Sequence, residues 1–196
     1  MTATEFDDAK LLWKSFYASH SFRQAREAAQ HIFDNKLEKE APLFHPLVVA
    51  IYTLYAKPFT RSDGVGRLEE SFVPKEHLQE HKIILEHRHQ IYAHRDADGF
   101  PIADHGAVNQ VRVVRTKQVM GLVATEFHAR YTAMPSIINL CRALEQKTDY
   151  NVKKLWDRHK GKIPNKVGEC LLNVLDPKTD MWLPQKPMIV ASHENT

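Results

Sequence analysis

The sequence predicts an all-α protein: a helical bundle of about five to six helices, with a minor β excursion or extended loop near residues 100–115. Only seven of the 196 residues are glycine, and long stretches lack turn-forming residues, which favours helices. Within those stretches, apolar residues recur every three or four positions, which places them on one helical face. A hydrophobic content of 43% and a charged content of 26% are ordinary for a globular chain.

The first part of the chain contains three segments with this helical spacing. The first runs from about Glu5 to Ser19, and the second runs from Ser21, interpreted as an N-cap, to Glu40. Pro42 and Pro46 predict a break before a third helix, which runs from Pro46 to Ala56. Because this third helix is apolar nearly all round, we expect it at the centre of the bundle.

A loop precedes the predicted fourth helix. Residues 58–71 include Gly64 and Gly66, which we expect to serve turn geometry. No strand precedes these glycines and no Gly-Lys-Ser/Thr follows them, so they do not form a phosphate loop. The fourth helix begins near Pro74, which suits a first turn, and runs to about Arg95. Asp98-Gly99 then supplies a turn, and the β excursion or extended loop follows.

The rest of the chain is predicted to contain one more long helix. It runs from about Lys117 to Lys147, with Pro135 kinking or interrupting it, and a basic helical segment continues to about Lys160. Three prolines at positions 177, 184 and 187 predict a mostly irregular tail. The chain is thus expected to divide into a helical domain, residues 1–165, and a C-terminal tail, residues 166–196.

Composition narrows the classes of protein to which this chain can belong. No run of 18 apolar residues exists and residues 1–8 are acidic, so neither a membrane span nor a signal peptide is predicted. Cys141 and Cys170 are too few for a disulfide framework and match no zinc spacing, which indicates reduced thiols in a cytoplasmic protein. The net charge of +3 is too small to identify a nucleic-acid binder.

The segment Lys147–Lys166 is more basic than the chain as a whole, with seven cations against two carboxylates. Such a stretch can follow a phosphate backbone through Lys153, Lys154 and Arg158, with Trp156 available for stacking. The competing interpretation is a solvated helical face with one tryptophan anchored in the core.

Histidines also raise the question of a metal site. The chain has twelve of them, and His77 and His81 have i, i+4 spacing on one helical face. However, no Glu-x-x-His follows at a matching position, so no metal site is predicted.

Arg88 and His94 are the most informative pair in the sequence. Arginine offers a planar, permanently charged fork for phosphate, and histidine exchanges a proton near neutral pH. The two residues are about 240° apart around an ideal helix and about 9 Å apart along it, so they do not point the same way. Within one monomer they converge on one phosphate only if the helix end unwinds. The competing interpretation is a helix-terminal histidine and a solvated arginine.

This pattern, Arg-polar-x(4)-His followed by a charged pair near the end of a long helix, resembles the Arg-x(4–6)-His signature of the HEPN superfamily. The Arg-x(5)-His-Arg-Asp run from Arg88 to Asp96 is similar to the abortive-infection and uncharacterised bacterial branch of that superfamily. The polar loop from Phe59 to Leu68 also resembles that branch. The resemblance covers about residues 45–130.

The resemblance implies a metal-independent endoribonuclease without a cofactor, in phage defence or a toxin system. Arg88 would bind the scissile phosphate and stabilise the transition state. His94 would act as general base or acid on the ribose 2′-hydroxyl or the leaving 5′-oxygen, which yields a 2′,3′-cyclic phosphate. His89 would orient this pair, and Tyr92 or Asp96 would tune His94.

The resemblance also implies partners: a second copy in a homodimer, RNA, and an antitoxin or other protein. Arg61 and Arg67 would be auxiliary RNA contacts or, in the competing interpretation, solvated loop residues. The x(5) spacing is typical of branches whose cleavage activity is less established. The alternative function is therefore a non-catalytic HEPN-like module that binds RNA, nucleotide or a protein partner. A third is a purely structural or interaction protein whose signature helix belongs to the core.

Overall fold

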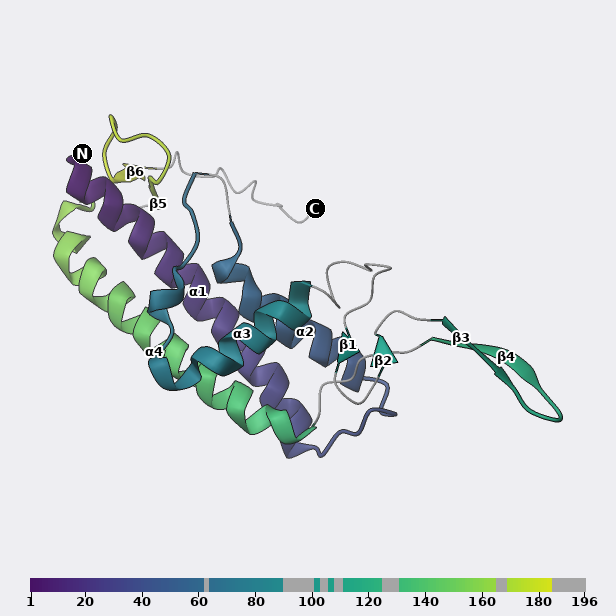
Figure 1. Cartoon of the computed structure of the whole chain (residues 1–196). Coiled ribbons are helices and arrows are strands. Elements are labelled where there is room, and N and C mark those ends of the chain that lie inside the picture. Colours follow the sequence, from purple (N-terminus) through teal and green to yellow (C-terminus); the bar gives the residue numbers. More distant parts are fainter. Residues whose placement is uncertain are drawn as a thin grey trace, which may run out of the picture.

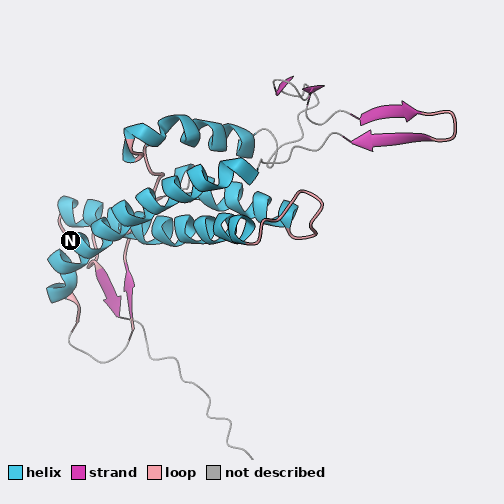
Figure 2. Cartoon of the chain, turned by 90° about the horizontal axis from the view of Figure 1, so that it is seen from below, coloured by secondary structure: helices cyan, strands magenta, loops and turns pink. Residues whose placement is uncertain are grey.

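The computed structural model describes residues 1–61, 64–89, 101–102, 106–107, 111–124, 131–164 and 169–184. The described residues form four α-helices: α1 (Ala3–Asp34), α2 (Phe44–Ala56), α3 (Leu78–His87) and α4 (Met134–His159). They also form three two-stranded antiparallel sheets: β1 (Pro101–Ile102) with β2 (Gly106–Ala107), β3 (Val111–Arg115) with β4 (Met120–Ala124), and β5 (Cys170–Leu172) with β6 (Trp182–Pro184). The predicted helical class is confirmed, whereas the predicted five to six helices are not matched within this part of the chain (Figures 1 and 2).

One continuous helix, α1, replaces the first two predicted helices. It begins at a capping box, in which Thr2 accepts a hydrogen bond from the Glu5 amide and the Glu5 carboxylate accepts one from the Thr2 amide. Ser21 is not an N-cap but a buried residue inside the helix. Residues 19–22 contain neither glycine nor proline, and several of them are buried, so packing carries the helix through the expected break.

The other long helix, α4, runs antiparallel to α1 (Figure 1). The predicted helix from Lys117 is wrong at its start, because residues 120–124 form strand β4 instead. Valine-rich β3 and β4 pair with each other, which favours extended backbone over helix. Pro135 lies in the first turn of α4, where its missing N–H costs nothing, and α4 then continues unbroken through the basic segment to His159.

Helices α2 and α3 form a second layer over the long pair. Helix α2 matches the predicted third helix within two residues. It was expected to be buried at the centre of the bundle, but it buries one face, whereas His45, Pro46 and Thr53 are exposed. The predicted fourth helix begins later than expected: Pro74 precedes a 3-10 turn, Lys75–His77, and α3 starts at Leu78. Its predicted end at Arg95 lies outside the described residues.

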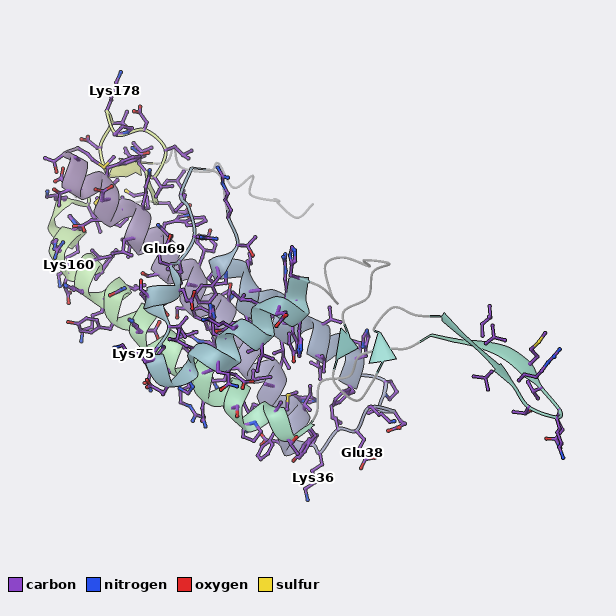
Figure 3. The ribbon with its side chains drawn as sticks, viewed as in Figure 1. Lys36, Glu38, Glu69, Lys75, Lys160 and Lys178 are labelled. Carbon is purple, nitrogen blue, oxygen red and sulfur yellow. The ribbon has the colours of Figure 1, made fainter. Side chains whose placement is uncertain are left out.

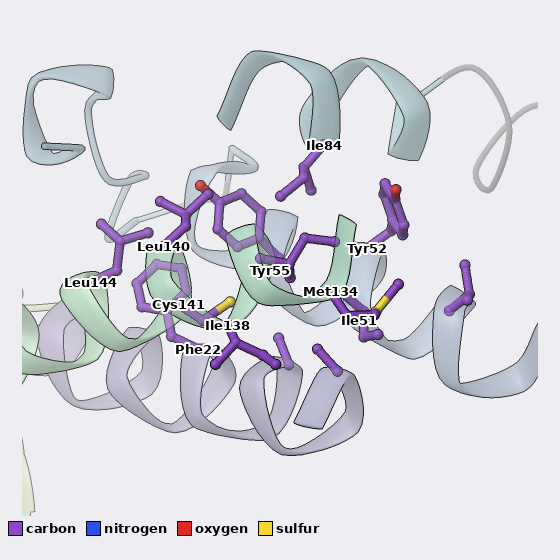
Figure 4. Packing of buried hydrophobic residues seen from close by; sticks show 14 of the residues in the cluster. Phe22, Ile51, Tyr52, Tyr55, Ile84, Met134, Ile138, Leu140, Cys141 and Leu144 are labelled. Atoms are coloured by element: carbon purple, nitrogen blue, oxygen red, sulfur yellow. The ribbon is translucent and has the colours of Figure 1, made fainter. Parts of the chain in front are cut away.

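The main core lies where all four helices meet. Figure 4 shows side chains from the four helices converging there, and the labelled residues are all buried. They are Phe22 from α1, Ile51, Tyr52 and Tyr55 from α2, Ile84 from α3, and Met134, Ile138, Leu140, Cys141 and Leu144 from α4. Cys141 is a free thiol, as predicted, and burial raises the pKa of that thiol well above its usual range.

A second, smaller core covers the N-terminal end of α1 and the C-terminal end of α4. The β5–β6 hairpin inserts Val174 and Met181 against Leu12 of α1 and Leu155 of α4. Residues 169–184 of the expected irregular tail are therefore partly ordered and pack on the helices. The prolines are compatible with this hairpin, because Pro184 is the last residue of β6 and Pro177 lies in the loop between the two strands.

The β3–β4 hairpin confirms a β excursion in the predicted region and projects away from the helices (Figure 1). Val113 and Leu122 are cross-strand partners and are 66% and 75% exposed. Arg115 and Lys117 are exposed on the same hairpin. An isolated two-stranded hairpin is at best marginally stable in water, so this element depends on contacts beyond itself.

None of the described helices is long and apolar enough to cross a membrane.

Candidate functional site

A buried histidine, His81, fixes α3 on the core just before the predicted signature. Tyr55 Oη and His81 Nδ1 lie 2.8 Å apart in a buried hydrogen bond. The ring of Phe59 packs edge-on against His81, with 4.5 Å between the ring centroids. Burial lowers the pKa of His81 and raises that of Tyr55, so both side chains are neutral at pH 7.

The next turn of α3 continues this contact with α2. Ile84 is fully buried, and the ring centroids of His87 and Tyr52 are 5.8 Å apart. Burial lowers the pKa of His87 as well. Three successive turns of α3 are thereby held against the core, and the residue after His87 has a defined position.

That residue is Arg88, the predicted phosphate-binding arginine. Its backbone keeps helical geometry and its N–H donates to the carbonyls of Ile84 and Leu85. The Arg88 side chain is half-buried, and His89 beside it is exposed. The helix C-terminus favours positive charge, which suits a cation at this position. Tyr92, His94 and Asp96 lie outside the described residues, so the structure places one half of the predicted site.

The glycine loop carries two of the predicted auxiliary cations. Gly64 and Gly66 have φ values of +82° and +80°, which confirms their expected role in turn geometry. Between them Val65 is buried in the second core and anchors the loop. Arg61 and Arg67 are exposed on either side of this anchor.

The C-terminal part of α4 contains both exposed lysines and an arginine that is paired with a carboxylate. Lys153 and Lys154 are exposed, whereas Arg158 Nη1 donates to Asp8 Oδ2 of α1 over 2.7 Å. His159 Nε2 approaches the same oxygen at 2.7 Å. Burial alone would raise the pKa of Asp8, but the hydrogen bonds from His159 and Arg158 outweigh it and hold that pKa below its usual value. Arg158 therefore joins α1 to α4.

Trp156 and Lys160 are both partly or fully exposed at the C-terminal end of α4. Trp156 is 45% exposed, with its ring edge-on to Trp182 of β6 at 5.9 Å between centroids. Figure 3 shows Lys160 at the outer side of α4, where it forms an exposed ion pair with Asp157. The surface thus offers two exposed lysines, Lys153 and Lys154, and a partly accessible indole, within the predicted RNA-tracking segment.

Sequence reasoning missed the polar links between α1 and α4. Glu145 accepts hydrogen bonds from Arg23 and Arg26. Burial alone would raise the pKa of Glu145, but these hydrogen bonds outweigh it and hold that pKa below its usual value. Ser19 donates to Asp149 nearby. These partners are more than a hundred positions apart, and no local pattern in the sequence signals such pairs.

Sequence reasoning also missed a pocket beside α1. Trp13 and Tyr17 lie one helical turn apart, with ring centroids separated by 4.5 Å. Ala18 and Ser21 follow on the same face, and their short side chains leave space beside the rings. The result is a pocket of about 280 Å³ between α1 and residues 57–68. The step from large to small side chains along one face is a signal that could have revealed it.

The two histidines considered for metal binding, His77 and His81, have different surroundings. His81 is committed to Tyr55, whereas His77 precedes α3. Among the described residues, no group of three or more His, Cys, Asp or Glu side chains is arranged to hold a metal ion.

Comparison with known proteins adds no assignment: the chain matches no protein-family model, no curated protein and no solved structure.

Proposed function

We propose that this chain is a HEPN-like, metal-independent endoribonuclease of the cytoplasm, acting in phage defence or a toxin system. The observation that carries the proposal is the position of Arg88. It follows a helix that the buried His81 and Ile84 and the partly buried His87 hold against the core, and it lies at that helix's C-terminal end with exposed His89 beside it. Catalysis by charge stabilisation requires a cation that is fixed before the substrate arrives.

The proposed chemistry is an internal transfer within RNA. A histidine, His94, takes the proton of a ribose 2′-hydroxyl, and the 2′-oxygen attacks the adjacent phosphorus. Arg88 stabilises the negative charge that develops on the phosphoryl oxygens. The bond to the 5′-oxygen breaks and that oxygen takes up the proton that His94 removed, which leaves a 2′,3′-cyclic phosphate and a 5′-hydroxyl. His89 orients the reacting pair, and Tyr92 or Asp96 tunes His94.

The test is cleavage of RNA by the purified full chain in the presence of EDTA. We expect cyclic-phosphate ends by mass spectrometry, and a loss of at least about 100-fold in rate for Arg88→Ala and for His94→Ala, the usual scale for such groups. Arg142→Ala and His20→Ala are matched controls, because both side chains are exposed on other helices. Cleavage that persists in Arg88→Ala, or that EDTA abolishes, would contradict the proposal.

The second candidate is a non-catalytic HEPN-like module that binds RNA, nucleotide or a protein partner. The β3–β4 hairpin favours it, because the exposed Val113–Leu122 pair lies beside the cations Arg115 and Lys117. Exposed apolar side chains of this kind mark binding surfaces. Binding of RNA without any cleavage, weakened by Arg115→Gln/Lys117→Gln, would favour this second function over the first.

A further inference from the structure

The wall of the pocket opposite α1 is formed by the turn that follows α2. The 3-10 turn η1 (Lys57–Phe59) contributes Pro58, and the Leu68 amide donates to the Pro58 carbonyl over 2.8 Å. This bond ties the two ends of the glycine loop together, and the buried Leu68 side chain lines the pocket. The walls are therefore held by backbone hydrogen bonding and core packing, which is typical of a largely pre-formed ligand site.

Two lysines line the same pocket. Lys14 comes from α1 and Lys57 from η1. Lys14 Nζ lies 3.8 Å from the position that a β-carbon on Gly66 would occupy, so the ammonium sits over the glycine turn. None of the described lining residues is a carboxylate, and neither ammonium pairs with a described acidic side chain. The pocket thus combines an excess of positive charge with an apolar interior.

We infer that this pocket binds a heteroaromatic anion of the size of a nucleoside monophosphate. The ring packs against Trp13 and Tyr17, and the anionic group binds Lys14 and Lys57. This inference goes beyond the ribonuclease proposal and does not depend on it, because Arg88 and His89 do not line the pocket.

Each part of the pocket matches a part of such a ligand. Tyr17 is 49% exposed, so a stacked ring removes apolar surface from water on both partners. Lysine binds phosphate as a compact point charge. The hydroxyls of Ser21 and Thr60 supply a few polar contacts to orient the ligand. The volume lies just below the roughly 300–1,000 Å³ typical of ligand pockets, which suits one nucleotide and excludes an oligonucleotide.

The first experiment compares three probes on the full chain by isothermal titration calorimetry. AMP carries both the ring and the anion, adenosine lacks the anion, and ribose 5-phosphate lacks the ring. We expect AMP to bind more tightly than either partial ligand, because only AMP uses both halves of the pocket.

The second experiment uses paired variants. Lys14→Gln/Lys57→Gln should weaken AMP binding by roughly 100-fold, about tenfold for each lost hydrogen bond to a charged group, and leave adenosine binding unchanged. Lys10→Gln is the control, a lysine of the same helix that does not line the pocket. Tyr17→Ala should weaken both AMP and adenosine, whereas Phe16→Ala should change neither, although Phe16 is 61% exposed next to Tyr17.

The outcomes separate this pocket from the signature helix. AMP binding that survives Arg88→Ala and is lost in Lys14→Gln/Lys57→Gln supports the inference. Absence of AMP binding at millimolar concentration overturns it. Equal binding of AMP and adenosine, or loss of AMP binding in Arg88→Ala alone, also overturns it. Thr60→Trp fills the pocket from its exposed rim, so it should block AMP without disturbing the buried core.

Discussion

His81 makes the attachment of α3 to α2 sensitive to pH. Burial lowers its pKa in the folded protein, so as pH falls the unfolded chain takes up a proton before the folded chain does. The stabilising contribution is therefore complete above about pH 6.5, the usual histidine value, and is lost as pH falls from there toward the lowered pKa. His87, whose pKa is lowered in the same way, adds to the effect.

Substitutions at the Tyr55–His81 hydrogen bond should show this dependence in urea denaturation between pH 5 and 8. Tyr55→Phe leaves a buried ring nitrogen of His81 without its partner, and we expect a loss of about 1–3 kcal/mol of unfolding free energy. Tyr55→Phe/His81→Phe removes both polar groups, so it should recover part of that loss at pH 7 and flatten the acid side of the profile. An unchanged pH profile in the double variant would show that His81 is not the titrating group.

At the scale of elements, the C-terminal end of α4 tests the predicted RNA surface. Neutralising the exposed pair in Lys153→Gln/Lys154→Gln should weaken RNA binding and reduce the salt slope by about 1.4, since each contact to a single-stranded phosphate contributes about 0.7. Filter binding at several salt concentrations measures both quantities. Cleavage at saturating RNA should barely change, because these lysines would position the substrate and not react with it.

Two comparisons make that result specific. Lys36→Gln/Lys39→Gln removes two charges at the opposite end of the α1–α4 pair, beyond the C-terminus of α1, and should leave the slope unchanged. Arg158→Gln should instead lower the melting temperature, because it removes a hydrogen-bond partner of Asp8. If the salt dependence of RNA binding is unchanged in Lys153→Gln/Lys154→Gln, the segment is a solvated helical face and not an RNA-binding surface.

Elements that local sequence determines were predicted correctly, whereas elements that distant contacts determine were not. The apolar run of α2 and the glycine turn at Gly64 and Gly66 are local features, and both were predictable. The break at Ser21 and the helix from Lys117 were wrong, because tertiary packing along α4 and strand pairing with β3 decide those segments. The order of residues 169–184 likewise comes from Val174 and Met181 packing on distant helices.

The candidate site was predictable to a similar degree. Arg88 was proposed from its spacing to His94 and from the helical pattern before it, and its role stays a prediction; the structure shows how His81, Ile84 and His87 hold the helix that precedes it. That Arg158 pairs with Asp8 could not be predicted, because the two residues are 150 positions apart. The step from large to small side chains along α1 is a local signal of the pocket, but its other wall depends on the fold bringing η1 against α1, which no local sequence pattern contains.

At the scale of the whole molecule, the proposed chemistry raises a geometric problem that a second copy solves. Arg88 and His94 are about 240° apart around an ideal helix, so one straight helix cannot aim both at one phosphate. Two signature regions that flank a common cleft can do so. The exposed apolar residues of β3–β4, including Val113 and Leu122, also suit burial against another protein surface.

We therefore predict a homodimer in which the C-terminal end of α3 lies near the two-fold axis. Light scattering at tens of micromolar should give twice the 22.6 kDa mass of the chain, and a cysteine placed at His89, which is exposed, should cross-link two copies under mild oxidation. A cysteine at Lys178, in the loop between β5 and β6, is the matched control and should not cross-link.

The double variant Val113→Thr/Leu122→Thr tests whether the β3–β4 hairpin contributes to the dimer interface. It should weaken association while leaving the melting temperature of the helices nearly unchanged, because these side chains are exposed and not part of either core. A monomer at these concentrations, or a dimer that cross-links through Lys178→Cys and not through His89→Cys, would contradict the prediction, because either result leaves Arg88 without a second signature region beside it.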